Sequence, residues 1–462
     1  MKRIYIIAQA FTLLSLFIVG CEDFVDVGLP NTRLTSGAVF STDATASAAA
    51  LGMYESMLRG SSFGTNGTPA SVATITGIYS DELVNYYSPN VPFAQNTLTA
   101  SNTTVLSIWS SAYYTIYTAN ALIEGLDASS TVTSSLKDQL VGEALFVRAF
   151  CHFYLTNLFG DIPLVLSTDY RNNGTAPRKE QSNVYEQIIH DIEQAAERLG
   201  QSYISAERAR PSAWSAKALL ARVYLFTGKW AEAETTATEI IDHTSLFQLE
   251  PDLANVFLKN SLEAIWQLSS TTPTSYNTYE GSYFILTTAP QVHALSQHLL
   301  NAFEPYDQRR FAWVGSFSNG VTTFYYPFKY KVKGGSNPLQ EHSIVLRLAE
   351  QYLIRAEARA RLGKLSGDNS AAADINIVRA RAALAELSFP TEDEALLAVE
   401  KERYIELFSE WGHRWLDIKR MGKAEAILSP IKPQWEEKAV LFPIPESELI
   451  SNPQLKPQNP GY

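Results

Sequence analysis

Apolar positions recur every three or four residues over long parts of the chain, which is the periodicity of amphipathic helices. The clearest early segments are residues 44–60 and 105–126. Residues 136–165 carry the same pattern, and Gly160 predicts where this third helix ends. Residues 61–104 are rich in Ser, Thr, Asn and Gly and predict a loop. The first half of the chain is therefore expected to consist of helices joined by loops.

Two later segments have the spacing of helical hairpins. In residues 211–241, Gly228 separates two helices, and the small residues Ala221 and Ala233 allow these helices to approach closely. A looser copy of the pattern occurs at residues 348–384. The sequence therefore predicts a mainly α fold, in which tetratricopeptide-like helical hairpins form a scaffold.

The segment between the two hairpins, residues 271–335, has a different composition. Aromatic residues are interspersed there with Gly, Ser, Thr and Asn, and only residues 290–303 have a helical pattern. The alternation in TTFYYPFKYKV predicts a strand, so we expect a loop-rich aromatic insert with a few short strands. In residues 431–462 frequent prolines exclude a long helix, and we expect an extended tail over the surface.

The N-terminus has the features of a secretory signal. A basic start precedes an apolar run that is marginal for a membrane-spanning helix, which needs about 20 residues. The run ends at Cys21 and resembles the bacterial lipobox, in which the signal is removed and the cysteine is acylated. We expect residues 1–20 to be a lipoprotein signal peptide, Cys21 to be lipidated and residues 21–40 to form a tether. The alternative is an ordinary secretory signal with a chance cysteine.

Composition and charge limit the partners. The chain has 37 Lys and Arg residues against 48 Asp and Glu residues, a net charge of −11. Such an acidic chain is poorly suited to bind nucleic acid or anionic lipid through charge. Hydrophobic residues make up 46% of the chain, which is typical of a folded globular protein. The other of the two cysteines, Cys151, lies in an apolar helix and is expected to be a small buried side chain.

The densest charge pattern is ERYIELFSEWGHRWLDIKR, residues 402–420. Glu402, Glu406, Glu410 and Arg414 are spaced four apart and share one face as long as the helix continues. Two of these carboxyls could form the acid and base of a glycosidase. Neighbouring arginines favour ionised carboxylates, however, whereas a general acid needs a raised pKa. We therefore expect an ion-pair network that fixes helix packing.

Motifs for catalysis and metal binding are missing from the sequence. It contains no HExxH and no Gly-rich phosphate loop, and its seven histidines do not have strong metal-ligand spacing. We therefore expect no catalytic residues, no cofactor and no metal, although a carbonyl-rich calcium site would escape this test.

Five segments carry a resemblance to a known family: GEALFVRAFCHFYLTNLFGDIPLV, AKALLARVYLFTGKWAEAE, RLAEQYLIRAEARARLG, ERYIELFSEWGHRWLDIKRMG and LFPIPESELISNPQLKPQNPGY. In this order they resemble the RagB/SusD family of outer-membrane nutrient-uptake lipoproteins. The resemblance implies a single SusD-like domain over residues 41–462, with its helical scaffold at 41–270 and 336–430. It also implies a non-catalytic cell-surface protein that is anchored to outer-membrane lipid through Cys21. Such a protein captures a glycan or a peptide and delivers it to a SusC-like TonB-dependent transporter.

The candidate ligand site was sought among aromatic residues on loops. Sugar rings present apolar C–H faces that lie on aromatic planes, and their hydroxyl groups need polar partners. Residues 78–96 and 272–284 supply both kinds of side chain. The candidate ligand-binding residues are Asp81, Asn85, Tyr86, Tyr87, Tyr276, Tyr279, Tyr283 and Trp313.

Two other functions stay open at this point. One is a surface glycoside hydrolase on a helical scaffold, with Asp81 or Glu82 as the catalytic carboxylate. The other is a purely structural scaffold whose hairpins bind protein partners.

Overall fold

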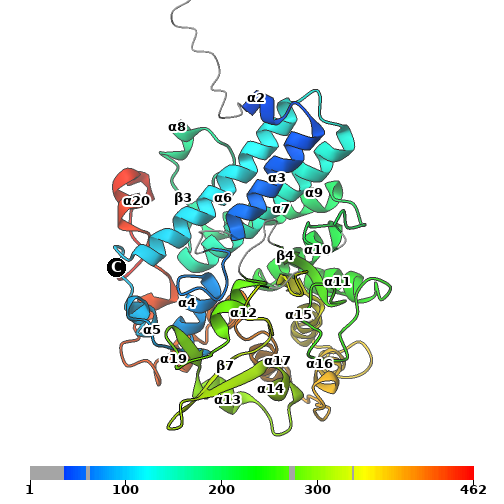
Figure 1. Cartoon of the computed structure of the whole chain (residues 1–462), viewed down its shortest axis with the longest axis vertical. Helices are drawn as coiled ribbons and strands as arrows, with labels where there is room; N and C mark the ends of the chain where they lie inside the picture. The colour runs from blue at the N-terminus through cyan, green and yellow to red at the C-terminus, as the bar shows by residue number, and fades with distance from the viewer. Residues whose placement is uncertain (1–35, 59–62, 206, 270–275, 336–337) are drawn as a thin grey trace, which may run out of the picture.

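The computed structural model describes residues 36–462, except 59–62, 206, 270–275 and 336–337. Helices make up most of the fold (Figure 1), which confirms the prediction of a mainly α protein. The signal peptide and Cys21 lie outside the described residues and stay predictions. No helix among the described residues is long and apolar enough to cross a membrane.

The helices, with their bounds, are α2 (Ser36–Val39), α3 (Asp43–Leu58), α4 (Val72–Tyr79), α5 (Val91–Ala94), α6 (Thr103–Ala128), α7 (Ser134–Phe159), α8 (Tyr170–Asn173), α9 (Gln181–Arg198), α10 (Ala213–Phe226), α11 (Trp230–Ile241), α12 (Tyr279–Phe284), α13 (Gln297–Ala302), α14 (Gln308–Trp313), α15 (Leu348–Arg361), α16 (Ala371–Arg381), α17 (Glu392–Glu406), α18 (His413–Arg420), α19 (Ala424–Leu428) and α20 (Glu446–Ser451). Short 3-10 helices are η3 (Ser88–Asn90), η4 (Glu437–Val440) and η5 (Pro453–Leu455). The strands are β1 (Leu83–Asn85), β2 (Ile162–Pro163), β3 (Arg178–Lys179), β4 (Ala264–Leu268), β5 (His293–Leu295), β6 (Val314–Ser318), β7 (Thr323–Pro327) and β8 (Ser343–Arg347).

Helix α7 is the central element of the first half. Its side chains are buried all round from Leu140 to Phe159, because α3, α6 and α9 pack against it (Figure 1). The helix ends where the sequence predicted, since Gly160 follows with φ +77°, a conformation that disfavours other residues. Cys151 lies on this helix and is fully buried, as expected.

The two predicted hairpins are present as α10–α11 and α15–α16. Ala221, Ala233 and Ala237 are fully buried, so the facing helices α10 and α11 pack closely. Helix α15 lies against both α10 and α11. The buried pair Arg222–Glu350 joins α10 to α15 at 2.7 Å. The hairpins therefore stack into one scaffold, as in tetratricopeptide arrays.

The strands form four antiparallel two-stranded sheets: β1–β5, β2–β3, β4–β8 and β6–β7. Strand β7 lies in the aromatic insert and confirms the strand predicted there. The prediction of a helix over residues 290–303 was only partly correct. Residues 293–295 pair with β1 instead, and Ser296 caps a shorter helix by accepting a hydrogen bond from the Leu299 amide at 3.1 Å.

The C-terminal tail, residues 431–462, contains only short helical turns, as its prolines require. Its expected position over the surface was only partly correct, because part of the tail enters the core. Phe442 and Ile444 are fully buried. The Phe442 ring packs edge-on against Tyr79 at 5.1 Å and against Phe159 at 6.0 Å. Apolar side chains between the prolines therefore fix the tail to the helices.

A buried ion-pair network centres on Glu406, which confirms the network interpretation of residues 402–420. Its carboxylate accepts hydrogen bonds from Arg347 at 2.7 Å and Arg309 at 3.0 Å, and from Arg381. All four side chains are at most 4% exposed. Burial alone would raise the pKa of Glu406, but the three arginines outweigh it and hold the pKa below its ordinary value.

The helix that carries Glu402 and Glu406 ends earlier than the four-residue spacing suggested. Helix α17 stops at Glu406, and α18 begins only after Gly412, which has φ +78°. Glu410 therefore lies in the connection and pairs with Arg347 at 2.8 Å, while Arg414 pairs with Asp81. The shared face, expected only as long as the helix continues, is therefore limited to Glu402 and Glu406, because the helix ends before Glu410.

Substitution of Glu406 tests whether this network stabilises the fold. Glu406→Gln leaves three buried arginines without their shared carboxylate, and breaking a buried pair costs about 3–5 kcal/mol. Denaturant unfolding should therefore show a loss of that size. Glu239→Gln is the matched control, since it removes the partly exposed pair with Lys217 and should change stability by about 0.5 kcal/mol or less. Equal losses in the two variants would contradict a central role for Glu406.

Candidate functional site

Tyr86 and Tyr87 follow β1 and project from the surface, with 45% and 39% of their areas exposed. Asn85 holds this turn, because its side chain donates to the Tyr87 carbonyl at 3.0 Å and accepts from the Tyr87 amide at 3.1 Å. The Tyr86 ring also meets Phe324 of β7 edge-on at 5.9 Å. The Asn85 side chain thus fixes the turn that carries Tyr86 and Tyr87, and the rings of both tyrosines are accessible at the surface.

Tyr276, Tyr279 and Tyr283 form a second aromatic group, with ring centroids 5.9–6.4 Å apart. Thr278 begins α12 by accepting a hydrogen bond from the Gly281 amide at 3.0 Å. Tyr279 and Tyr283 are four residues apart on this helix, so they share a face. Their rings stack at an interplanar angle of 27°. All three tyrosines are partly exposed.

The two aromatic groups belong to neighbouring elements. Phe284 at the end of α12 packs edge-on against His293 of β5 at 4.9 Å. Strand β5 in turn pairs with β1 and contacts β7. Figure 1 shows α12 and β7 in the same part of the molecule, below the long helices α3, α6 and α7. We call Tyr86, Tyr87, Tyr276, Tyr279 and Tyr283 the tyrosine group.

Asp81 and Trp313 are buried, unlike the tyrosine group. The Asp81 carboxylate accepts two hydrogen bonds from Arg414, at 2.8 and 2.9 Å. Trp313 is fully buried, and its indole N–H donates to the Leu253 carbonyl at 2.9 Å. Neither side chain presents a group to a surface ligand, so we do not include them in the proposed site.

Sequence reasoning did not select Phe324 and Tyr325, although the alternation that predicted β7 contains both. Phe324 packs against Tyr86, and the Arg310 guanidinium lies 4.7 Å from the centroid of the Tyr325 ring. Arg310 is followed by Phe311, which is 68% exposed. The region of β7 and α14 thus adds aromatic surface and a cation.

Glu280 lies beneath the tyrosine group and fastens α12 to β8. Its carboxylate accepts a hydrogen bond from the Ser343 hydroxyl, and the side chain is buried. Burial raises the pKa of Glu280 to about 7, against the opposing hydrogen bond from Ser343. The helix that carries Tyr279 and Tyr283 is therefore anchored by a carboxyl that titrates near neutral pH.

The geometry gives little support to the alternative of a catalytic Asp81 or Glu82. Asp81 is occupied by Arg414, and Glu82 is 1% exposed, so neither carboxyl reaches a polymer at the surface. Burial, with the charge of Asp81, raises the pKa of Glu82 to about 8. Among the described residues, no group of three His, Cys, Asp or Glu side chains is placed to hold a metal ion.

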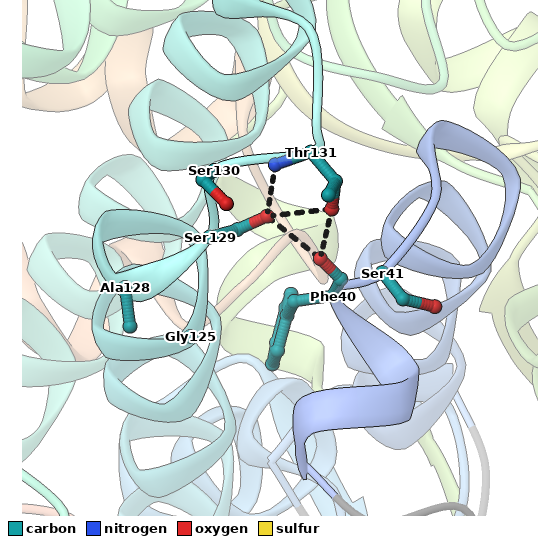
Figure 2. A pocket seen from close by; sticks show the side chains of 7 residues that line it. All are labelled: Phe40, Ser41, Gly125, Ala128, Ser129, Ser130 and Thr131. Atoms are coloured by element: carbon teal, nitrogen blue, oxygen red, sulfur yellow. Dashed lines mark hydrogen bonds between the residues drawn. The ribbon is translucent and has the colours of Figure 1, made fainter.

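A separate cavity of about 440 Å³ lies where the chain enters the domain, between Phe40 and the end of α6 (Figure 2). The Ser129 hydroxyl donates to the Phe40 carbonyl at 2.7 Å, and the Thr131 hydroxyl donates to the same carbonyl at 3.3 Å. Gly125 lies against the Phe40 ring, and an added Cβ would clash with it. These contacts hold Phe40, the last residue of the predicted tether, against the end of α6. No charged side chain lines the cavity.

Comparisons with known proteins identify the family. Residues 45–225 match the model described as starch-binding associating with outer membrane, and residues 309–462 match that of the SusD family. SusD-like protein P2 of Formosa agariphila is 28% identical over 515 residues, covering 98% of this chain and 99% of the relative. The chain belongs to the SusD/RagB family.

Solved structures confirm the SusD fold. A SusD superfamily protein from Bacteroides vulgatus has a TM-score of 0.79 at 22% identity and covers 91% of this chain and 99% of its own. A laminarin-binding SusD-like protein has a TM-score of 0.77 at 25% identity, with 92% and 100% covered. Surface glycan-binding protein A from Bacteroides fluxus has a TM-score of 0.75 at 20% identity, with 91% and 100% covered.

The pH dependence of stability tests the role of Glu280 in this SusD/RagB-family protein. When unfolded, its carboxyl loses the proton near pH 4.5; when folded, it holds the proton to about pH 7. The folded state therefore binds more protons in between, and stability falls as pH rises through this window. Glu280→Gln cannot ionise and escapes this loss. As the pH rises from 4.5 to about 8, its free energy of unfolding should therefore increase by roughly 2–3 kcal/mol relative to that of the parent.

Glu304→Gln is the control of opposite sign. Hydrogen bonding from Arg379 lowers the pKa of Glu304 to about 2, so this carboxylate stabilises the fold above pH 4.5. The control variant should lose stability at neutral pH and approach the parent as the pH falls. Thermal unfolding of the three proteins at both pH values gives the comparison. Parallel pH profiles for the parent and Glu280→Gln would contradict the assignment.

Proposed function

We propose that this protein is a cell-surface lipoprotein that binds a glycan and delivers it to a SusC-like TonB-dependent transporter, without catalysis. The observation that carries the proposal is the tyrosine group: five partly exposed tyrosines on neighbouring loops and a short helix. Aromatic faces offer large apolar area at fixed positions, which suits the C–H faces of sugar rings.

The names of similar proteins support a carbohydrate ligand. One structural neighbour is a laminarin-binding SusD-like protein, and another is a surface glycan-binding protein. The family model over residues 45–225 is described as starch-binding associating with outer membrane. A glycan is therefore favoured over a peptide, and laminarin is the first ligand to test.

A membrane tether makes modest affinity sufficient. A protein held beside the transporter by an acylated Cys21 has a high effective concentration there, of the order of millimolar for a short flexible linker. A ligand that is bound too tightly would be released slowly, because differences in affinity lie mostly in the dissociation rate. We propose that the protein captures the glycan and releases it unchanged.

Binding measurements with tyrosine variants test the proposed ligand. Tyr86→Ala and Tyr283→Ala each remove a ring from the tyrosine group and should weaken glycan binding about tenfold, equivalent to 1.4 kcal/mol. Tyr114→Ala is the matched control, because Tyr114 is 62% exposed but lies on α6. Calorimetry with laminarin and a panel of other glycans gives the affinities, and chromatography of the bound glycan reports any cleavage. Cleavage by the parent, or unchanged affinity in both variants, would refute the proposal.

Labelling with palmitate tests the anchor. Cys21→Ser should abolish incorporation of the label and release the protein from the membrane fraction, since the thiol is the proposed site of acylation. Cys151→Ser is the control, because Cys151 is fully buried and should not affect labelling. Equal labelling of the parent and Cys21→Ser would exclude the lipoprotein assignment. Copurification of the parent with an outer-membrane barrel protein tests the transporter partnership.

A further inference from the structure

A cavity of about 400 Å³ lies between α6 and the C-terminal segment α20–η5. Small-molecule sites have volumes of about 300–1,000 Å³, so this cavity is large enough for a ligand. Its remaining wall comes from β2, the residues after it and the end of α8. Figure 1 shows α20 well separated from α12 and β7, so the cavity is distinct from the tyrosine group.

Three aromatic side chains line the α6 side of the cavity. Trp109, Tyr113 and Tyr117 are spaced four apart and therefore share one helical face. The Trp109 and Tyr113 rings lie 4.9 Å apart at 49°. The Tyr113 hydroxyl donates to the Pro163 carbonyl at 2.8 Å, which fixes the ring. Tyr117 is 50% exposed and leaves a ring accessible to solvent.

Polar groups also line the cavity, on α6 and on the facing elements. The hydroxyls of Ser110 and Ser451 are exposed, and neither has a hydrogen-bond partner within the described part of the chain. The Asn173 amide nitrogen donates to the Ser167 carbonyl at 2.8 Å, and its oxygen has no partner among the described residues. Glu448 supplies a half-buried carboxyl.

We propose that this cavity binds a neutral sugar ring and is a second carbohydrate site, separate from the tyrosine group. The aromatic face of α6 suits the apolar C–H face of the ring, and Glu448, Ser110 and Ser451 suit its hydroxyl groups. A wholly apolar ligand would separate Glu448, Ser110 and Ser451 from water without offering them hydrogen-bond partners.

Glu448 is the one charged side chain that lines the cavity among the described residues, so a cation is the main alternative to a neutral sugar. Burial raises the pKa of this carboxyl, while a hydrogen bond with Trp109 opposes the rise. Partial burial thus makes this carboxyl a weaker partner for an amine than a fully exposed glutamate would be. Aromatic rings can also bind a cation through cation–π contacts without help from an ionised carboxylate. The test therefore includes a cationic probe.

Ligand-observed saturation-transfer NMR tests the cavity directly. The full-length protein is held in a detergent without a sugar head group, and the probes are glucose, galactose, mannose and xylose, with choline as the cation. The variant Tyr86→Ala/Tyr283→Ala, which weakens the tyrosine group, should still transfer saturation to at least one sugar. In that background Tyr117→Ala and Glu448→Gln should each weaken the binding about tenfold.

Two further variants separate binding from folding. Ser110→Trp adds bulk at an exposed position of the cavity wall and should block the sugar signal without removing a core side chain. Tyr114→Ala, on the same helix but not lining the cavity, should keep the signal. Absence of transfer to every sugar, a signal for choline alone, or unchanged binding in the three cavity variants overturns the proposal. If the parent failed to bind laminarin but the cavity still bound a sugar, the proposed function would be contradicted and the cavity proposal would stand.

Discussion

The carboxylate of Glu406, held between three buried arginines, is the interaction on which the second half of the fold depends. Arg309, Arg347 and Arg381 come from α14, β8 and α16, so a single side chain joins three elements to α17. A buried charge of this kind is stabilising only when every partner is present, because desolvation is costly. The same arrangement fixes the relative positions of the elements that border the aromatic insert.

The network also explains how loops can present a site. Strand β8 ends at Arg347 in the network and begins at Ser343, which hydrogen-bonds Glu280 on α12. The tyrosines on α12 are therefore connected through one short strand to the buried ion-pair network. A ligand that binds the tyrosines on α12 then needs to order little of the surrounding chain. The entropic cost of binding is therefore lower than for tyrosines on an unanchored loop.

Local features of the fold were predictable from the sequence, and long-range ones were not. Gly160 and Gly228 mark helix ends because positive φ favours glycine, and a short window contains that information. The ion-pair role of residues 402–420 was also predictable, since arginines lie nearby. The partner of Asp81, in contrast, is Arg414, 333 residues away. Asp81 and Trp313 were selected by residue type alone, and only their distant partners, Arg414 and Leu253, explain their burial.

The two proposed carbohydrate sites have a combined consequence for transport. Two modest sites on one protein would bind a glycan that reaches both more tightly than either site alone, because the second contact is intramolecular. Each site releases its own segment quickly, however, so the chain can be handed over stepwise rather than in one slow dissociation. A short oligosaccharide spans only one site and gains nothing from the second. If both proposed sites bind sugar, the arrangement would favour polymers over their fragments, without any need for a single high-affinity pocket.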